Sequence, residues 1–214
     1  MVMGRSLFAF ATLLVLTFGA SGHAVAATPW QNPNWPCFQR YVPTVSPAQY
    51  WGGPPPPAGV NWRTDPKMAA IVRSVTKPGV DLKDGQASLA AFARSISPDL
   101  RKAVLPEAFW GIVERINQRR ASLMKRIMEL AKRQRRLSNQ IATISEKVKT
   151  IPSNEKELLA NGASSDPNLQ IMQQRAFMIR IFHETQATMQ YACQAPVELE
   201  AKLGAYARIL QPLL

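Results

Sequence analysis

From residue 109 onward, apolar side chains return along the chain in alternating steps of four and three residues. Eleven of the thirteen positions on this repeat are apolar; the full set is Phe109, Val113, Ile116, Arg120, Leu123, Ile127, Leu130, Gln134, Leu137, Ile141, Ile144, Val148 and Ile151. A period of 3.5 residues sustained over about six heptads is typical of a coiled-coil seam. The pattern predicts one long helix that begins at Pro106, ends before Pro152 and buries its seam against a partner helix.

The chain after Pro152 predicts a tip at about 152–166 and then a returning helix. Asp166-Pro167 has the form of a helix cap followed by a first-turn proline. The apolar residues beyond it form two faces, which implies burial on two sides: Leu169, Met172, Ala176 and Ile179 on one, Ile171, Met178, Phe182 and Met189 on the other. Residues 106–214 are therefore predicted to form a long antiparallel coiled-coil hairpin, in which Pro196 kinks or breaks the returning helix.

Residues 65–105 are predicted to form a base of small helices for this hairpin. Asp65-Pro66 begins the first helix and Lys77-Pro78-Gly79 ends it. A second helix carries Leu89, Phe92, Ala93 and Ile96 on one face, and Ser97-Pro98 opens another turn or two. The predicted fold class is all-α.

Residues 28–64 hold four tryptophans and most of the prolines, including the run from Pro54 to Pro57. Proline lacks the amide donor and fixes its own φ, so this segment is predicted to be extended or polyproline-like. We expect an irregular strap along the helices, with the tryptophans as plugs. The alternative is that the four prolines dock into an aromatic groove of a partner.

Residues 1–27 have the pattern of a secretory signal peptide. Arg5 precedes an apolar run from Leu7 to Ala20, and small residues follow, so cleavage is expected after Ala26 or Ala27. The apolar run is shorter than the roughly 20 residues that cross a bilayer, which argues against the alternative of a retained anchor. The mature protein is expected to be periplasmic or secreted.

The mature chain would keep two cysteines, Cys37 and Cys193. An even cysteine count in an oxidising compartment predicts one disulfide, with two independent free thiols as the alternative. His183 is the one histidine of the mature chain, and no paired ligand spacing surrounds either cysteine. We therefore expect no metal and no other cofactor.

The formal net charge of +12 is concentrated in one stretch of the predicted long helix. Nine Lys or Arg residues stand between Arg115 and Arg136 against a single acid, Glu129. The candidate partner-binding residues are the arginines that follow one side of the helix, Arg115, Arg119, Arg126, Arg133 and Arg136. They suit an acidic protein partner, or an anionic phospholipid, lipopolysaccharide or wall polymer; a solvated helix face is the plain alternative. Export argues against nucleic acid.

The sequence contains no G-x-S-x-G elbow, H-E-x-x-H motif, glycine-rich phosphate loop or C-x-x-C pair. His183 and Glu184 are neighbours in sequence and point in different directions on a helix. We therefore expect no enzyme, and interpret the chain as an exported adaptor, scaffold or assembly factor for an envelope protein complex. The seam also allows pairing between two copies of the chain.

Three short motifs resemble an uncharacterised group of small exported bacterial helical proteins. They are W-P-C-F-Q-R-Y-V-P-T-V-S at 35–46, R-Q-R-R-L at 133–137 and Y-A-C-Q-A-P at 191–196. The resemblance implies that Cys37 pairs with Cys193. It implies no particular activity.

Overall fold

The computed structural model describes residues 32–160 and 166–214, and for residues 157–160 it describes the backbone alone. The predicted signal peptide and part of the predicted tip lie outside these residues. The described chain is all-helical, as predicted, and contains no strand. In order, the elements are η1 (Pro47–Gln49), α1 (Pro66–Val75), α2 (Leu82–Ser95), α3 (Pro98–Lys149), α4 (Ser153–Ala160), α5 (Pro167–Leu210) and η2 (Gln211–Leu213).

Three helices begin at an aspartate whose side chain caps free backbone amides. Asp65 accepts hydrogen bonds from the amides of Lys67 and Met68 at the start of α1. Asp81 and Asp166 each accept one such bond at the start of α2 and of α5. Such caps satisfy amides that have no partner within the helix, which explains why the boundaries predicted at Asp65 and Asp166 are correct.

The prediction that the long helix begins at Pro106 is wrong, because α3 already begins at Pro98. Pro106 lies inside α3 as a buried residue. An internal proline removes the hydrogen bond to the carbonyl of the residue four positions earlier, here Lys102. Lys102 is an exposed residue on the surface of α3. The burial of Pro106 and its neighbours in the core then outweighs the lost bond.

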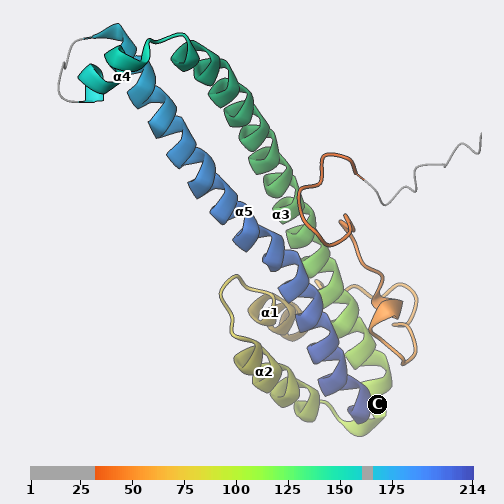
Figure 1. Ribbon diagram of the computed structural model, residues 1–214. Coiled ribbons are helices and arrows are strands. Elements are labelled where there is room, and N and C mark those ends of the chain that lie inside the picture. Colours follow the sequence, from red (N-terminus) through yellow and green to blue (C-terminus); the bar gives the residue numbers. More distant parts are fainter. Residues whose placement is uncertain (1–31, 161–165) are drawn as a thin grey trace, which may run out of the picture.

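Helices α3 and α5 run antiparallel and side by side (Figure 1). Two hydrogen bonds between them fix the register: Arg120 Nη1 donates to the carbonyl of Pro196 at 2.7 Å, and Gln134 Nε2 to that of Phe182 at 3.2 Å. Both pairs place Cys193 opposite about residue 123. Pro196 does not interrupt α5, which continues to Leu210.

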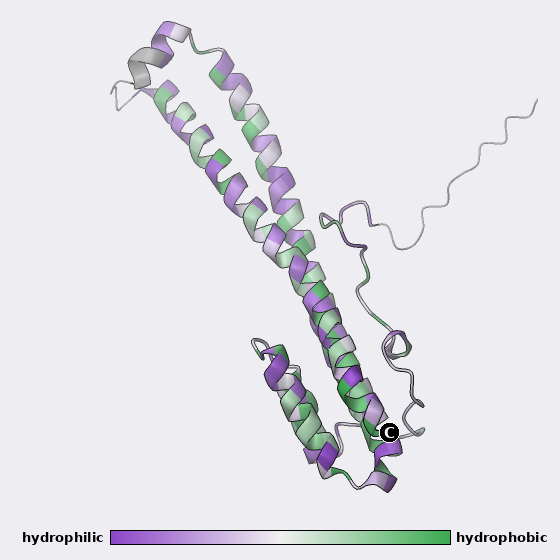
Figure 2. Ribbon diagram, turned by 60° about the horizontal axis from the view of Figure 1, so that its bottom comes forward, coloured by the Kyte–Doolittle hydropathy of each residue, from purple (hydrophilic) through white to green (hydrophobic). Residues whose placement is uncertain are grey.

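The core lies at one end of the long helices, where α1 and α2 pack against them. Its fully buried side chains include Val72, Leu89, Phe109, Ile112 and Leu203. The last buried residue of α3 is Ala131 and the first of α5 is Thr185. Beyond that level, residues 132–149 and 167–184 project as two arms whose apolar residues are at best half-buried. Hydrophobic colouring is accordingly densest at the core end in Figure 2.

The N-terminal segment (residues 32–65) lies along the side of α3 that α1 and α2 leave open (Figure 1). Its one helical turn is η1. The Trp51 ring stacks on Phe109, with 4.9 Å between ring centroids. The Asn117 side chain bonds both the amide and the carbonyl of Val45, each at 2.9 Å. These contacts hold an irregular chain in place without a β-ladder or a long helix.

Candidate functional site

Three of the five predicted arginines share one groove on the surface of α3. Arg126, Arg133 and Arg136 are exposed and line it. The groove has a volume of about 670 Å³, and its other lining residues are Ser122, Lys125, Glu129 and Leu130. We call it the arginine groove. It runs along the exposed side of α3 from Ser122, at the level of the last buried residues of the helix, to Arg136 in the arm.

The other two predicted arginines lie apart from the arginine groove. Arg119 lines a second hollow of about 520 Å³, where α3 meets α5 and the loop between α1 and α2. This hollow also carries Asp81, Glu198 and Lys202, so its charges are mixed. Arg115 is half-buried near Glu114. The spacing of the five arginines along one helix could not reveal this division, because the division depends on which neighbouring elements cover each turn of α3.

The arginine groove keeps its positive charge. Among the described residues the ion pairs are Arg63–Glu114, Arg120–Glu200 and Lys149–Glu146, and none of them involves an arginine of the groove. Helical like charges at spacings of three, four and seven repel each other by a few tenths of a kcal/mol per close pair. An anionic ligand would relieve that repulsion.

Arg120 belongs to the interior. Its side chain is 1% exposed and pairs with Glu200 at 2.5 Å. Its two terminal nitrogens also donate to the carbonyls of Pro196 in α5 and Val42 in the N-terminal segment. The one seam position that carries a charge therefore joins three parts of the chain.

The predicted disulfide between Cys37 and Cys193 is confirmed. It joins the N-terminal segment to α5, with 5.6 Å between the two Cα atoms. Gln39 Nε2 also donates to the backbone carbonyl of Cys193. A disulfide is consistent with an oxidising, exported compartment.

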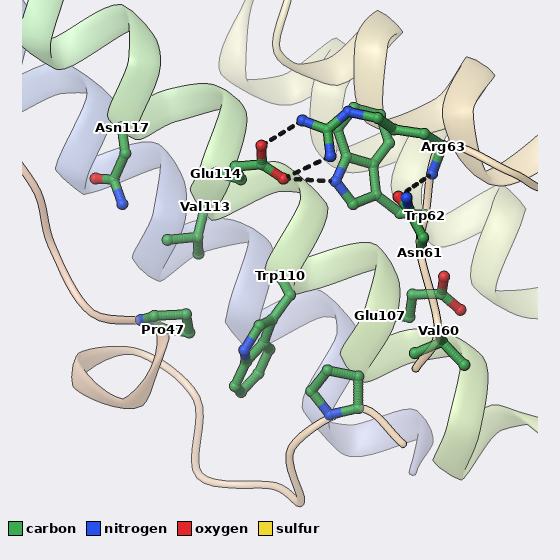
Figure 3. A pocket seen from close by; sticks show the side chains of 11 residues that line it. Pro47, Val60, Asn61, Trp62, Arg63, Glu107, Trp110, Val113, Glu114 and Asn117 are labelled. Carbon is green, nitrogen blue, oxygen red and sulfur yellow. Dashed lines mark hydrogen bonds and ion pairs between the residues drawn. The ribbon is translucent and has the colours of Figure 1, made fainter. Parts of the chain in front are cut away.

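A cleft that the sequence analysis missed lies between the N-terminal segment and α3 (Figure 3). Its volume is about 500 Å³. The apolar walls are Pro47, Pro56, Val60, Trp62, Trp110 and Val113. Glu107, Trp110, Glu114 and Asn117 recur on α3 at steps of three and four, so they share one face of the helix. This mixed aromatic and polar face of the helix was the feature of the sequence that could have indicated the cleft. The residues of the N-terminal segment that complete the cleft were not predictable.

Glu114 organises one end of the cleft. It accepts a hydrogen bond from Trp62 Nε1 at 2.9 Å and pairs with the Arg63 guanidinium, which lies 4.3 Å from the centre of the Trp62 ring. The hydrogen bonds from Arg63 and then Trp62 lower the pKa of Glu114. The hydrogen-bonding groups at this end of the cleft therefore satisfy one another (Figure 3).

The other end of the cleft has unused bonding capacity. Within the described chain, the Glu107 carboxylate and Trp110 Nε1 have no hydrogen-bonding or ionic partner. Burial, and secondarily the charge of Asp65, raise the pKa of Glu107. A carboxylate in that position favours a cationic neighbour.

The described residues contain no group of three or more His, Cys, Asp or Glu side chains placed to hold a metal ion. His183 is exposed on α5. Among the described helices, none combines the length and the apolar character that crossing a membrane requires.

Comparison with known proteins yields no family model, no curated protein and no solved structure that matches the chain. The resemblance of the three short motifs to small exported helical proteins stays a prediction. Function must therefore be argued from the geometry.

Proposed function

We propose that this protein is a non-enzymatic, exported adaptor, scaffold or assembly factor for an envelope protein complex. The observation that carries the proposal is the arginine groove, in which Arg126, Arg133 and Arg136 are exposed and unpaired within the described chain. All its lining residues belong to α3, so a partner can reach the groove without displacing α1, α2 or the N-terminal segment.

The partner we envisage is an acidic helix that lies along α3. Arg126 and Arg133 are seven residues apart, so acids at heptad spacing on a parallel or antiparallel helix would meet both. Leu130 lies between them on the lining and offers an apolar contact. Arginine suits this role because its planar guanidinium binds carboxylates through two parallel hydrogen bonds.

The partly buried apolar residues of the two arms are the second observation that supports the proposal. Their seam positions, among them Leu137, Ile141 and Ile144, are only half-buried in the single chain. We infer that α3 and α5 act as a coiled-coil hairpin whose arms accept a further helix. A second copy of the chain is the homo-oligomeric form of the same arrangement.

The test is affinity capture of the oxidised mature protein from its own solubilised envelope, with mass spectrometry of what co-purifies. We expect a stoichiometric acidic protein with the wild type, and its loss with the triple variant Arg126→Gln, Arg133→Gln, Arg136→Gln. The matched control removes three exposed charges from α1 and α2 with Arg73→Gln, Lys83→Gln and Arg94→Gln, and should retain the partner. Equal capture by both triple variants would refute a role for the groove.

The alternative is a binder of anionic lipid, lipopolysaccharide or wall polymer. The composition of the arginine groove favours this alternative, because Glu129 is its single acid. Arginine also binds phosphate as well as carboxylate. It predicts that the protein sediments with acidic vesicles and that 0.5 M salt reverses this, because the electrostatic screening length falls to about 4 Å near that ionic strength. Sedimentation without any captured protein would replace the adaptor proposal with this one.

A further inference from the structure

The cleft between the N-terminal segment and α3 has bonding capacity that the fold does not use. At one end Glu114, Trp62 and Arg63 satisfy each other, and Asn117 bonds both the amide and the carbonyl of Val45. At the other end one carboxylate, Glu107, and one indole donor, Trp110 Nε1, are left over in the described chain. A ligand for this cleft must therefore offer a cation and a hydrogen-bond acceptor.

The walls add a requirement for shape and polarity. Tryptophan faces and proline rings line the cleft, and its volume of about 500 Å³ is within the range of sites that enclose small ligands or a few peptide residues. A proline-rich extended peptide suits such walls, since it presents carbonyl acceptors and few amide donors that would be left unpaired. Among cations, guanidinium is the one that both stacks on indole and binds a carboxylate.

We propose that this cleft binds an extended, proline-flanked arginine of a partner peptide, with the guanidinium on the Glu107 carboxylate and a peptide carbonyl accepting from Trp110 Nε1. Arg63 is an example of the same chemistry within the chain, because it lies over the Trp62 ring and pairs with Glu114. Charge complementarity selects this occupant over an anionic one, because the cleft carries the Glu107 carboxylate, unpaired within the described chain, whose pKa the nearby negative charge of Asp65 helps to raise.

This site is independent of the proposed function. The arginine groove is lined by Ser122 to Arg136 and attracts anions, whereas the cleft is lined on α3 by Glu107 to Asn117 and attracts a cation. Substitutions in one leave the other intact, so each proposal can fail without the other.

The experiment titrates the oxidised, uniformly ¹⁵N-labelled mature protein with an acetylated and amidated Pro-Pro-Arg-Pro peptide and follows the indole Nε1–H resonances. Trp110→Phe assigns the resonance of Trp110. We expect a saturable shift of that resonance with a dissociation constant below a few millimolar. The same peptide with citrulline in place of arginine keeps the shape and loses the charge, and should bind at least about tenfold more weakly.

Two variants locate the charge that is recognised. Glu107→Gln should weaken the arginine peptide about tenfold and leave the citrulline peptide unchanged, while Asp99→Asn, an exposed acid in the first turn of α3, should change neither. Because Glu107 has no partner in the described fold, its glutamine variant should keep the wild-type circular dichroism spectrum. Absence of a saturable shift at Trp110, or equal affinity for the two peptides, would overturn the proposal.

Discussion

At the scale of single residues, Arg120 shows how a charge is tolerated at a seam position. Burying a charge is costly unless it is paired and hydrogen-bonded. Arg120 has Glu200 as counter-ion and two backbone carbonyls as acceptors, although its Nε has no partner in the described chain. It stabilises the meeting point of α3, α5 and the N-terminal segment in place of an apolar residue.

Replacement of Arg120 by methionine should lower the free energy of unfolding by about 2–4 kcal/mol, because the buried carbonyl of Pro196 and the partly buried carbonyl of Val42 lose their donor. Glu200→Gln should also be destabilising, because Arg120 then stays buried without its counter-ion, but less so than Arg120→Met, since the two carbonyls keep their donor and the glutamine oxygen can still accept a hydrogen bond. Urea denaturation of both variants measures the difference. A methionine variant as stable as the wild type would mean that an apolar seam residue fully replaces this network.

At the scale of the elements, two helical glycines have opposite environments. A Cβ on Gly111 of α3 would lie 2.8 Å from Cγ of the buried Trp62 ring, which its hydrogen bond to Glu114 holds in place. A Cβ on Gly204 of α5 would meet nothing closer than the flexible Arg208 Nη1, at 3.4 Å. Gly111 is required by close packing, whereas nothing around Gly204 excludes a side chain.

Gly204→Ala should therefore raise the free energy of unfolding by about 0.5–1 kcal/mol, the usual gain for alanine in a helix interior. Gly111→Ala should lower it by about 1–3 kcal/mol because the overpacking cost exceeds that gain. Thermal or urea unfolding compares the two variants directly. Stabilisation by both would show that the Trp62 ring moves freely, contrary to its burial.

The helices were predictable to the extent that local signals decide them. Aspartate caps and first-turn prolines located α1 and α5 because a capped terminus depends on neighbouring residues alone. The prediction that a helix begins at Pro106 was wrong because burial of this proline in the core outweighs the hydrogen bond that it removes from the helix. The cleft was not predictable, since residues 47–63 and 107–117 meet only after the N-terminal segment has folded along α3. The separation of the five arginines between different surfaces was not predictable for the same reason, because it depends on which part of α3 is covered by α5 and by the loop before α2.

At the scale of the whole molecule, the disulfide joins residues that are 156 positions apart. On the chain-entropy model, closing so long a loop contributes up to about 5 kcal/mol. The double variant Cys37→Ser, Cys193→Ser should therefore unfold at a markedly lower temperature than the oxidised wild type in calorimetry. A reductant should lower the wild-type midpoint towards the same value and leave the double variant unchanged; equal midpoints for the two oxidised proteins would contradict the prediction.

The end of the core at Ala131 and Thr185 has a consequence for how the molecule opens. Protection of an amide against hydrogen exchange follows the free energy of the local opening that exposes it, and few buried contacts make that opening easy. The arms (residues 132–149 and 167–184) lack buried residues, whereas Arg120 and the Cys37–Cys193 link lie on the core side of the boundary. Partial unfolding should therefore start at the far end and stop near this level. A partner that binds the arms would act on the least stable cooperative unit of the protein, so that binding and ordering of the arms become one event.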